Sequence, residues 1–202
     1  LWKFTISSGQ WTWVSGSRLA DNLSVKGIYG TKGTPDLTNV PGGRYGAASW
    51  TDTSGNLWLF SGYGWDSANN LGPLNDLWKF NISSGQWTWV SGADITRQSG
   101  SYGTKGTASA GNVPGARQWA MGWFDAANAN LWLFGGNGYD SSGSTSTNNL
   151  SDLWKFNIDS GQWTWVSGAS VGGQSGTYGT LGVTSAGNVP GAREDAMSWI
   201  DA

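Results

Sequence analysis

The chain has 202 residues, including 33 glycines and 16 tryptophans, with only 12% charged residues and a formal net charge of −2. This length can bury a sizeable core, and the composition favours turns and aromatic-rich strands over helices. The charge excludes a broad basic surface for nucleic acid, and no apolar run approaches the roughly 20 residues of a membrane span.

Cysteine and histidine are both absent. Their absence excludes disulfides, thiol nucleophiles, the usual zinc sites and histidine acid–base catalysis within this chain. We therefore expect no cofactor and no enzymatic activity from these residues. The few charges and the many Ser, Thr, Asn and Gly residues are typical of extracellular bacterial proteins, which predicts a secreted or cell-surface location.

A repeat begins with the first residues of the chain. LWKF starts at Leu1, Leu77 and Leu153, which lie 76 residues apart. The nine residues SGQWTWVSG follow each LWKF without a change, at 8–16, 84–92 and 160–168. Such regular copies are the signature of a repeat architecture.

Four short strands are predicted within each period. In the middle copy they are 47–50 (AASW), 57–60 (LWLF), 77–82 (LWKFNI) and 87–90 (WTWV), with a tight SSGQ turn between the last two. The first strand recurs at 120–124 and 196–200. In LWLF the leucines point to one side and Trp58 and Phe60 to the other, so both faces are apolar and both need cover. This pattern predicts stacked four-stranded antiparallel sheets, the blades of a β-propeller, in preference to a two-layer sandwich.

A long connection leads from each fourth strand to the next first strand. It contains the related segments 28–44, 101–117 and 177–193, which share a YGTxG motif and end in NVPGGR or NVPGAR. A loop copied so closely is predicted to have a defined packed shape.

These features resemble the kelch family of β-propellers. The resemblance rests on the glycine pair Gly135 and Gly136 after the second strand, on LWKFN, and on a tryptophan after a short polar turn, Trp87 or Trp163. It is closest to large bacterial kelch-like repeats and to the central domain of galactose-oxidase-like proteins. The chain departs from the family in two ways, because its period exceeds the roughly 50 residues of ordinary kelch repeats and because Ser61 replaces the first glycine in the other copy.

The repeat predicts a division of the chain into parts. Residues 1–46 would hold the last two strands of a blade and a connection, 47–118 and 119–195 would each hold one blade and its connection, and 196–202 the first strand of a further blade. About 11 strands cannot close a ring of four-stranded blades. We expect a segment of a larger propeller, whose partners are other blades of the same parent chain or further copies of itself.

Three arginines occupy equivalent positions at the ends of the connections: Arg44, Arg117 and Arg193. Several arginines on one propeller face could clamp a carboxylate ligand. The alternative is a structural role, with each arginine bound to backbone carbonyls or to a neighbouring carboxylate such as Asp76 or Asp152. The paired tryptophans of SGQWTWVSG could likewise stack on sugars, although packing between blades is the favoured interpretation.

The loops between the second and third strands supply the remaining candidates. Asp66 and Asp140 hold matching positions and could bind calcium, the alternative being simple Asx turns. Tyr63, Trp65 and Tyr139 are the predicted contacts for a partner, because loops on a rigid scaffold usually carry recognition. The loops that diverge between copies, 17–26, 94–99 and 142–149, are predicted to give specificity.

The favoured function is a non-catalytic interaction or structural scaffold that binds proteins or glycans through its loops. One alternative is part of a carbohydrate-active or oxidase propeller whose catalytic residues lie outside this chain. A second alternative is a repetitive subunit that assembles with copies of itself.

Overall fold

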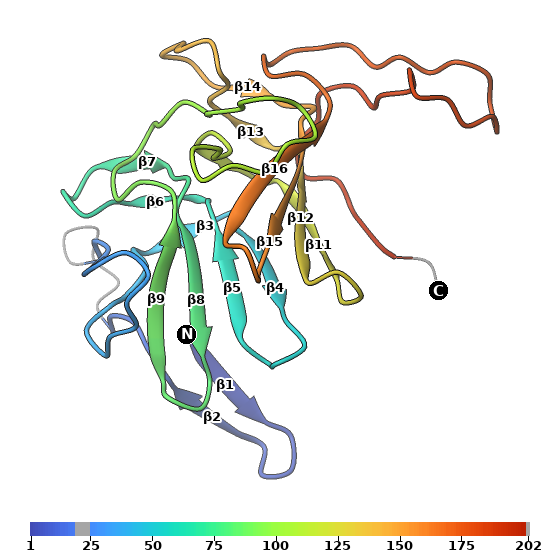
Figure 1. Ribbon diagram of the computed structural model, residues 1–202. Helices are drawn as coiled ribbons and strands as arrows, with labels where there is room; N and C mark the ends of the chain where they lie inside the picture. The colour runs from blue at the N-terminus through green and yellow to red at the C-terminus, as the bar shows by residue number, and fades with distance from the viewer. Residues whose placement is uncertain (19–24, 201–202) are drawn as a thin grey trace.

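The computed structural model describes residues 1–18 and 25–200, and every regular element among them is a β-strand (Figure 1). Two four-stranded antiparallel sheets form the main body. Sheet A consists of β4 (Ala48–Thr51), β5 (Leu57–Phe60), β8 (Leu77–Asn81) and β9 (Gln86–Ser91). Sheet B consists of β11 (Met121–Asp125), β12 (Asn130–Phe134), β15 (Leu153–Asn157) and β16 (Gln162–Ser167). The fold is therefore all-β, as the composition predicts.

The two sheets have the same strand order and the same register. Their orders are β4-β5-β8-β9 and β11-β12-β15-β16, and Leu59 pairs with Trp78 as Leu133 pairs with Trp154. The four strands predicted within a period are all present at the expected places. The sequence repeat is thus also a structural repeat.

The sheets pack face to face through the alternating side chains of β5 and β12. Trp58 and Phe60 point from sheet A toward sheet B, where they contact Phe156 and Trp163 at ring-centroid distances of 5.9 and 5.1 Å. Leu131 and Leu133 of β12 belong to the same buried cluster. This packing covers one of the two apolar faces predicted for LWLF.

The opposite face of sheet A carries a second cluster. Tyr29, Trp78, Phe80 and Trp87 are buried there, with Leu57 and Leu59 packed against them. Both faces of β5 are therefore apolar and largely covered, as the alternation of LWLF requires.

Six further short strands lie at one end of the large sheets and were not predicted as strands. They form two three-stranded sheets, with the orders β3-β6-β7 and β10-β13-β14. Their bounds are Arg44–Tyr45 (β3), Tyr63–Trp65 (β6), Leu71–Pro73 (β7), Arg117–Gln118 (β10), Asn137–Gly138 (β13) and Asn148–Asn149 (β14). These strands pair the loops after β5 and β12 with the residues at the ends of the first two PGxR segments.

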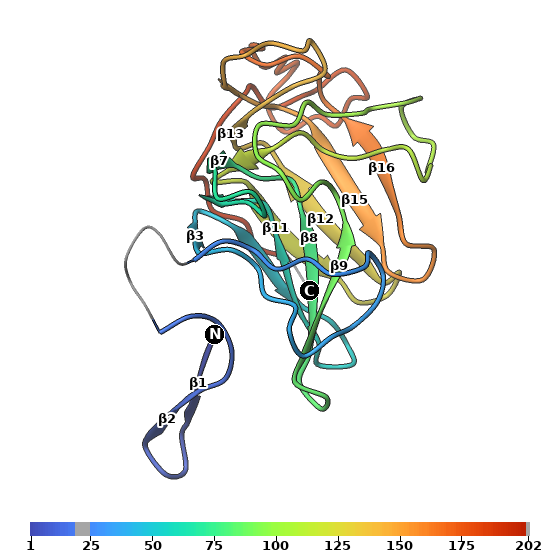
Figure 2. The ribbon, with the colours of Figure 1, turned by 90° about the vertical axis from the view of Figure 1, so that its left-hand side faces the viewer.

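The N-terminal LWKF and WTWV segments pair only with each other. They form the hairpin of β1 (Trp2–Thr5) and β2 (Gln10–Trp13), which stands apart from the main body in Figure 2. Ser15 nevertheless accepts a hydrogen bond from the indole Nε1 of Trp87 at 3.1 Å. Most side chains of this hairpin are exposed, in contrast to their counterparts in sheets A and B.

The predicted strand at 196–200 is absent, and this prediction is wrong. Met197 and Trp199 are exposed, and the segment runs without strand pairing. A strand forms by hydrogen bonding along a neighbour, and β4 and β11 each pair with an LWLF strand. The described residues offer no free LWLF strand to 196–200. They also form no closed ring of sheets, so the ring of a propeller is not seen among them; residues 201–202 of the last predicted unit lie outside the described part.

Candidate binding surface

Arg117 lies at the centre of a buried polar cluster that joins a connection to sheet B. Its guanidinium donates to both oxygens of Asp152, at 2.7 and 2.8 Å, and the side chains of both residues are 0% exposed. It also donates to the carbonyl oxygens of Gly115 and Gly135. Tyr102 donates its hydroxyl to Asp152 at 2.6 Å. Every polar group of Arg117 that could clamp a ligand is directed at the protein itself.

Arg44 forms the same cluster in the preceding copy. It donates to both oxygens of Asp76 at 2.6 and 2.8 Å and to the carbonyls of Gly42 and Ser61. Tyr29 donates to Asp76 at 2.6 Å, as Tyr102 does to Asp152. The structure therefore places Arg44 and Arg117 in two separate ion pairs, the structural role that was the alternative to a ligand clamp.

Electrostatics in these clusters favour a neutral tyrosine and a charged arginine. Burial raises the pKa of the Tyr29 and Tyr102 hydroxyls, and the adjacent carboxylate raises it further. Burial alone would lower the pKa of Arg44 and Arg117, but the charge of the paired aspartate and its hydrogen bonds outweigh this effect and raise it. Each cluster thus holds a neutral tyrosine and a charged arginine on one carboxylate.

Arg193, the third arginine, has a different environment. It is exposed, and its one side-chain hydrogen bond within the described residues runs from Nε to the carbonyl of Gly191 at 3.0 Å. Tyr178, the counterpart of Tyr102, is 72% exposed. This copy has the donors of the cluster but no carboxylate.

Asp66 and Asp140 are saturated with hydrogen-bond donors. Asp66 accepts from the backbone amides of Ala68, Asn70 and Thr96. Burial would raise its pKa, but these hydrogen bonds outweigh burial and lower it. Asp140 accepts from the amides of Ser142 and Gly172 in the same manner.

These contacts correspond to the Asx-turn alternative for both aspartates. No group of three or more metal-ligating side chains of the His, Cys, Asp and Glu types comes together anywhere in the described ranges.

The paired tryptophans of SGQWTWVSG pack inside the protein in the second and third copies. Trp163 is 1% exposed and contacts Phe156 of its own sheet and Phe60 of sheet A. Trp165 packs edge-on against Tyr102, and the ammonium of Lys105 lies 4.3 Å from its ring centroid. Both tryptophans hold neighbouring segments together, as the packing interpretation predicts.

The predicted loop contacts differ in accessibility. Tyr139 is buried, with its hydroxyl directed at the carbonyl of Thr145, so it presents little surface to a partner. Tyr63 and Trp65 are half-buried on β6. The ring of Tyr63 stacks on Tyr45, which is 56% exposed, with centroids 5.5 Å apart. Of the divergent loops, most of 17–26 lies outside the described residues.

A backbone ladder links equivalent positions of successive repeats beside Tyr63. The amide of Trp119 donates to the carbonyl of Gly46 at 2.7 Å, and the amide of Asp195 donates to the carbonyl of Trp119 at 3.0 Å. All three residues have left-handed backbones, with φ of 65°, 56° and 52°. The backbone geometry is thus conserved between repeats while the side chains differ completely.

Trp119 is the least expected member of this ladder. A left-handed backbone costs a non-glycine residue about 1–3 kcal/mol, and such strain is found preferentially at functional sites. Its ring is 38% exposed and lies 6.3 Å from that of Tyr45. In the first repeat a glycine, Gly46, holds the position without strain.

The residues one position earlier carry unsatisfied acceptors. Gln118 Oε1 and Glu194 Oε2 are buried oxygens without a hydrogen-bond partner within the described residues. Buried polar atoms of this kind normally find a partner. We define the ladder surface as Tyr45, Tyr63, Gln118, Trp119, Glu194 and Asp195.

Sequence reasoning missed most of the ladder surface. The signal was present, because the two residues after each PGxR read YG, QW and ED in otherwise nearly identical segments. Only the structure shows that these pairs adjoin one another and the ring of Tyr63.

Comparison with known proteins gives a likeness of structure alone. No protein-family model matches the chain, and no curated protein matches it. Among solved structures it is similar to the one described as the structure of YjhT, with 17% sequence identity and a TM-score of 0.46. The match covers 69% of this chain and 41% of that one, so the chain spans about two fifths of its length. The described part of the chain contains no helix that could cross a membrane.

Proposed function

We propose that sheets A and B are blades of a kelch-like β-propeller that acts as a non-catalytic scaffold outside the cell. Their identical strand order and face-to-face packing support this proposal. The burial of Arg44 and Arg117 in ion pairs gives the most regular polar groups of the chain a structural task. The extracellular location rests on composition alone.

The ladder surface is the proposed binding site of this scaffold. The observation that carries the proposal is that Gly46, Trp119 and Asp195 share one backbone conformation but have different side chains. If the ladder served stability alone, a glycine would fit this left-handed position better than the strained Trp119. Exposed aromatic faces suit the apolar faces of a ligand, and the buried, unpartnered oxygens of Gln118 and Glu194 suit its hydroxyl donors. A glycan has this chemistry, and it is the ligand class that we favour over a protein.

A glycan array probed with the intact chain tests the proposal. The variant Trp119→Gly introduces the residue of the first repeat at the same left-handed position, so it removes the ring without adding strain. We expect its affinity for the selected glycan to fall about tenfold or more, as for a central aromatic contact, with a melting temperature that does not fall. The variant Ile6→Ala, at a 90% exposed position of the N-terminal hairpin, serves as the control.

Three results would contradict the proposal. These are no binding to any glycan, equal binding by the Trp119→Gly variant and the unmodified chain, and turnover of a bound glycan. Capture of a purified protein ligand that Trp119→Gly abolishes would instead retain the site and replace the ligand class.

A further inference from the structure

The third connection, 177–193, keeps the shape of the other two without the sheet on which they rest. Its bridge between Thr177 and Val189 repeats the bridge between Ser101 and Val113. Asn188 donates to the carbonyl of Val183 at 3.1 Å, as Asn112 donates to that of Thr107 at 2.9 Å. The loop is therefore pre-shaped, and Figure 1 shows it extending away from sheets A and B.

The occupied copy shows what such a loop binds. The amides of Gly106 and Ser109 donate to the carbonyls of Trp165 and Trp163 on β16, at 2.7 and 3.3 Å. Asn112 donates a side-chain hydrogen bond to the same carbonyl of Trp163 at 3.1 Å. The loop thus grips the backbone of a WTWV strand, while Tyr102 and Arg117 bind the aspartate that precedes the partner LWKF strand. The connection 28–44 makes the same contacts with sheet A.

In the third copy these side chains keep at most their bonds within the loop and have no sheet to bind among the described residues. Asn188 lacks the second acceptor that Asn112 has, and Tyr178 makes no hydrogen bond within the described residues. The terminal nitrogens of Arg193 have no partner there either. A guanidinium beside a tyrosine hydroxyl, in a geometry that twice holds a carboxylate, is complementary to a third carboxylate.

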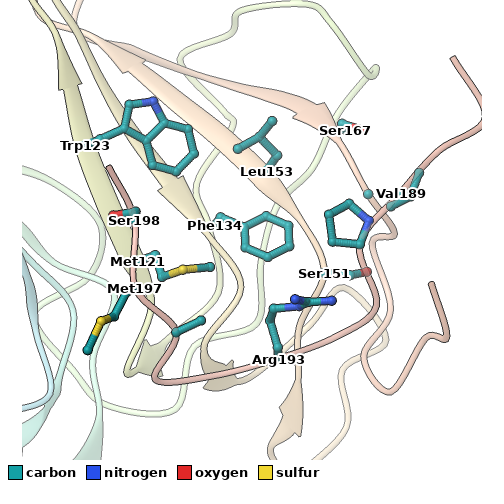
Figure 3. Close-up of a pocket in the computed structure, with 13 residues that line it drawn as sticks. Met121, Trp123, Phe134, Ser151, Leu153, Ser167, Val189, Arg193, Met197 and Ser198 are labelled. Atoms are coloured by element: carbon teal, nitrogen blue, oxygen red, sulfur yellow. The ribbon is translucent and has the colours of Figure 1, made fainter. Parts of the chain in front are cut away.

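An apolar pocket of about 340 Å³ adjoins Arg193 (Figure 3). It lies between β11, β12 and β15 of sheet B and the segment after Arg193, and its apolar lining includes Met121, Trp123, Phe134 and Leu153. Phe134 is the counterpart of Phe60, which packs on Trp163 of the neighbouring sheet. The pocket therefore lies on the face of sheet B that corresponds to the covered face of sheet A.

We propose that this C-terminal docking surface, made of 177–193 and the pocket beside Phe134, binds a β-hairpin of the repeat's own third and fourth strands preceded by an aspartate. The occupant is a further repeat unit with the sequence pattern of 76–92, and the aspartate is the recognition element. Asp76 and Asp152 of another copy cannot serve, because both are buried in their own clusters. The inference rests on the proposed blade arrangement of sheets A and B, but it concerns another surface and does not depend on the ladder surface binding a glycan.

The test adds the missing hairpin as a peptide. The probe is the 18-residue segment 75–92, NDLWKFNISSGQWTWVSG, with a fluorescent label, titrated with the intact chain. A second peptide carries Asp76→Asn, which keeps the shape and removes the charge. We expect saturable binding of the first peptide and at least about tenfold weaker binding of the second, because two charge-assisted hydrogen bonds are lost.

Variants of the chain locate the site. The Arg193→Gln variant should bind the two peptides equally. It has already lost the ion pair with the peptide aspartate, so changing that aspartate to asparagine has no further ion pair to remove. Arg193 makes one exposed hydrogen bond, so this variant should remain folded. Arg18→Gln, at another exposed arginine, is the matched control and should behave as the unmodified chain.

One variant should strengthen binding. Lys32 and Lys105 each lie over a tryptophan of the gripped strand, at 4.2 and 4.3 Å from the ring centroid, and donate to the carbonyls of Gly92 and Gly168. Leu181 holds this position in the third copy and is fully exposed. Leu181→Lys should raise the affinity for the peptide about two- to fivefold.

Two results would overturn the proposal: no saturable binding, or equal affinity for the Asp and Asn peptides. Concentration-dependent dimers in sedimentation that Arg193→Gln abolishes would also overturn it, because they would show a second copy on this surface. Since no glycan is present, failure here leaves the proposed glycan site at the ladder surface standing.

Discussion

The two arginines at the ends of PGAR segments provide a stability test with a control inside the same chain. Arg117→Gln removes a side chain that is 0% exposed and leaves Asp152 as a buried carboxylate without its ion pair. It also leaves the buried carbonyls of Gly115 and Gly135 without their donor. Arg193→Gln makes the same chemical change where the arginine is exposed and forms one hydrogen bond.

The magnitudes follow from these surroundings. Breaking a buried ion pair by removing one partner costs about 3–5 kcal/mol. Tyr102 and Trp154 still donate hydrogen bonds to Asp152 in the variant. We therefore expect Arg117→Gln to lower the free energy of unfolding by an amount within this range and not above it. For a chain of this size that loss lowers the melting temperature by about 6–20 °C. A substitution at the surface, such as Arg193→Gln, should change the free energy of unfolding by no more than about 0.5 kcal/mol.

Urea unfolding followed by tryptophan fluorescence measures both variants. An unchanged dependence on urea concentration in both would show that the midpoints report stability and not a change of the unfolded state. Equal destabilisation by the two variants, or a loss below about 1 kcal/mol for Arg117→Gln, would refute the assignment of the Arg117 cluster as a structural lock.

Three further predictions use the same repeats. Trp163→Ala should lower the free energy of unfolding, measured in urea, by about 3–5 kcal/mol, because the ring is 1% exposed. Trp11→Ala at the equivalent, 65% exposed position should lower it by less than about 1 kcal/mol. Similar losses in the two variants would contradict the packing interpretation. Gly85→Ala should lower the free energy of unfolding by about 1–2 kcal/mol, because alanine is strained in the left-handed backbone. Gly92→Ala should lower it clearly more, because the new Cβ would also lie 2.0 Å from the carbonyl of Asn75. Calorimetry that finds Gly85→Ala the more destabilising of the two would contradict this prediction. Hydrogen bonds lower the pKa of Asp66 in the folded state below its ordinary value of 3.8, so the unfolded state binds more protons in acid. The contribution of Asp66 to the free energy of unfolding should therefore be constant above about pH 5 and fall below about pH 4. The Asp66→Asn variant should show a smaller fall in acid, and an equal fall in the variant would exclude this contribution.

The strands of the repeat could be predicted because their cause is local. LWLF, LWKFN and WTWV alternate apolar residues on both sides, and glycine turns separate them. The same reasoning failed at 196–200, where AMSWI resembles the sequence of β11 but finds no partner among the described residues. A strand needs a second strand for its hydrogen bonds, and no property of five residues reports whether one is near.

The candidate site could be predicted only in part. Tyr63 and Trp65 were chosen for their loop, and Tyr63 does lie in the ladder surface. Tyr45 and Trp119 were missed because their rings adjoin only where two repeats meet. The hydrogen bond that joins the repeats there runs from Trp119 to Gly46, which lie 73 residues apart in the chain. Arg44 and Arg117 illustrate the opposite case, since their sequence positions fit a ligand clamp and a structural ion pair equally, and burial decides for the ion pair.

The nine residues SGQWTWVSG separate what the local sequence determines from what depends on the tertiary structure. The sequence alone determined a tight glycine turn followed by a strand, and all three copies have this form, because left-handed glycine and alternating side chains are properties of the local backbone. It could not determine that Trp11 is exposed while Trp163 is buried. Burial depends on which distant segments cover a strand, and identical residues acquire different roles when one copy lies between two sheets and another lies at the surface.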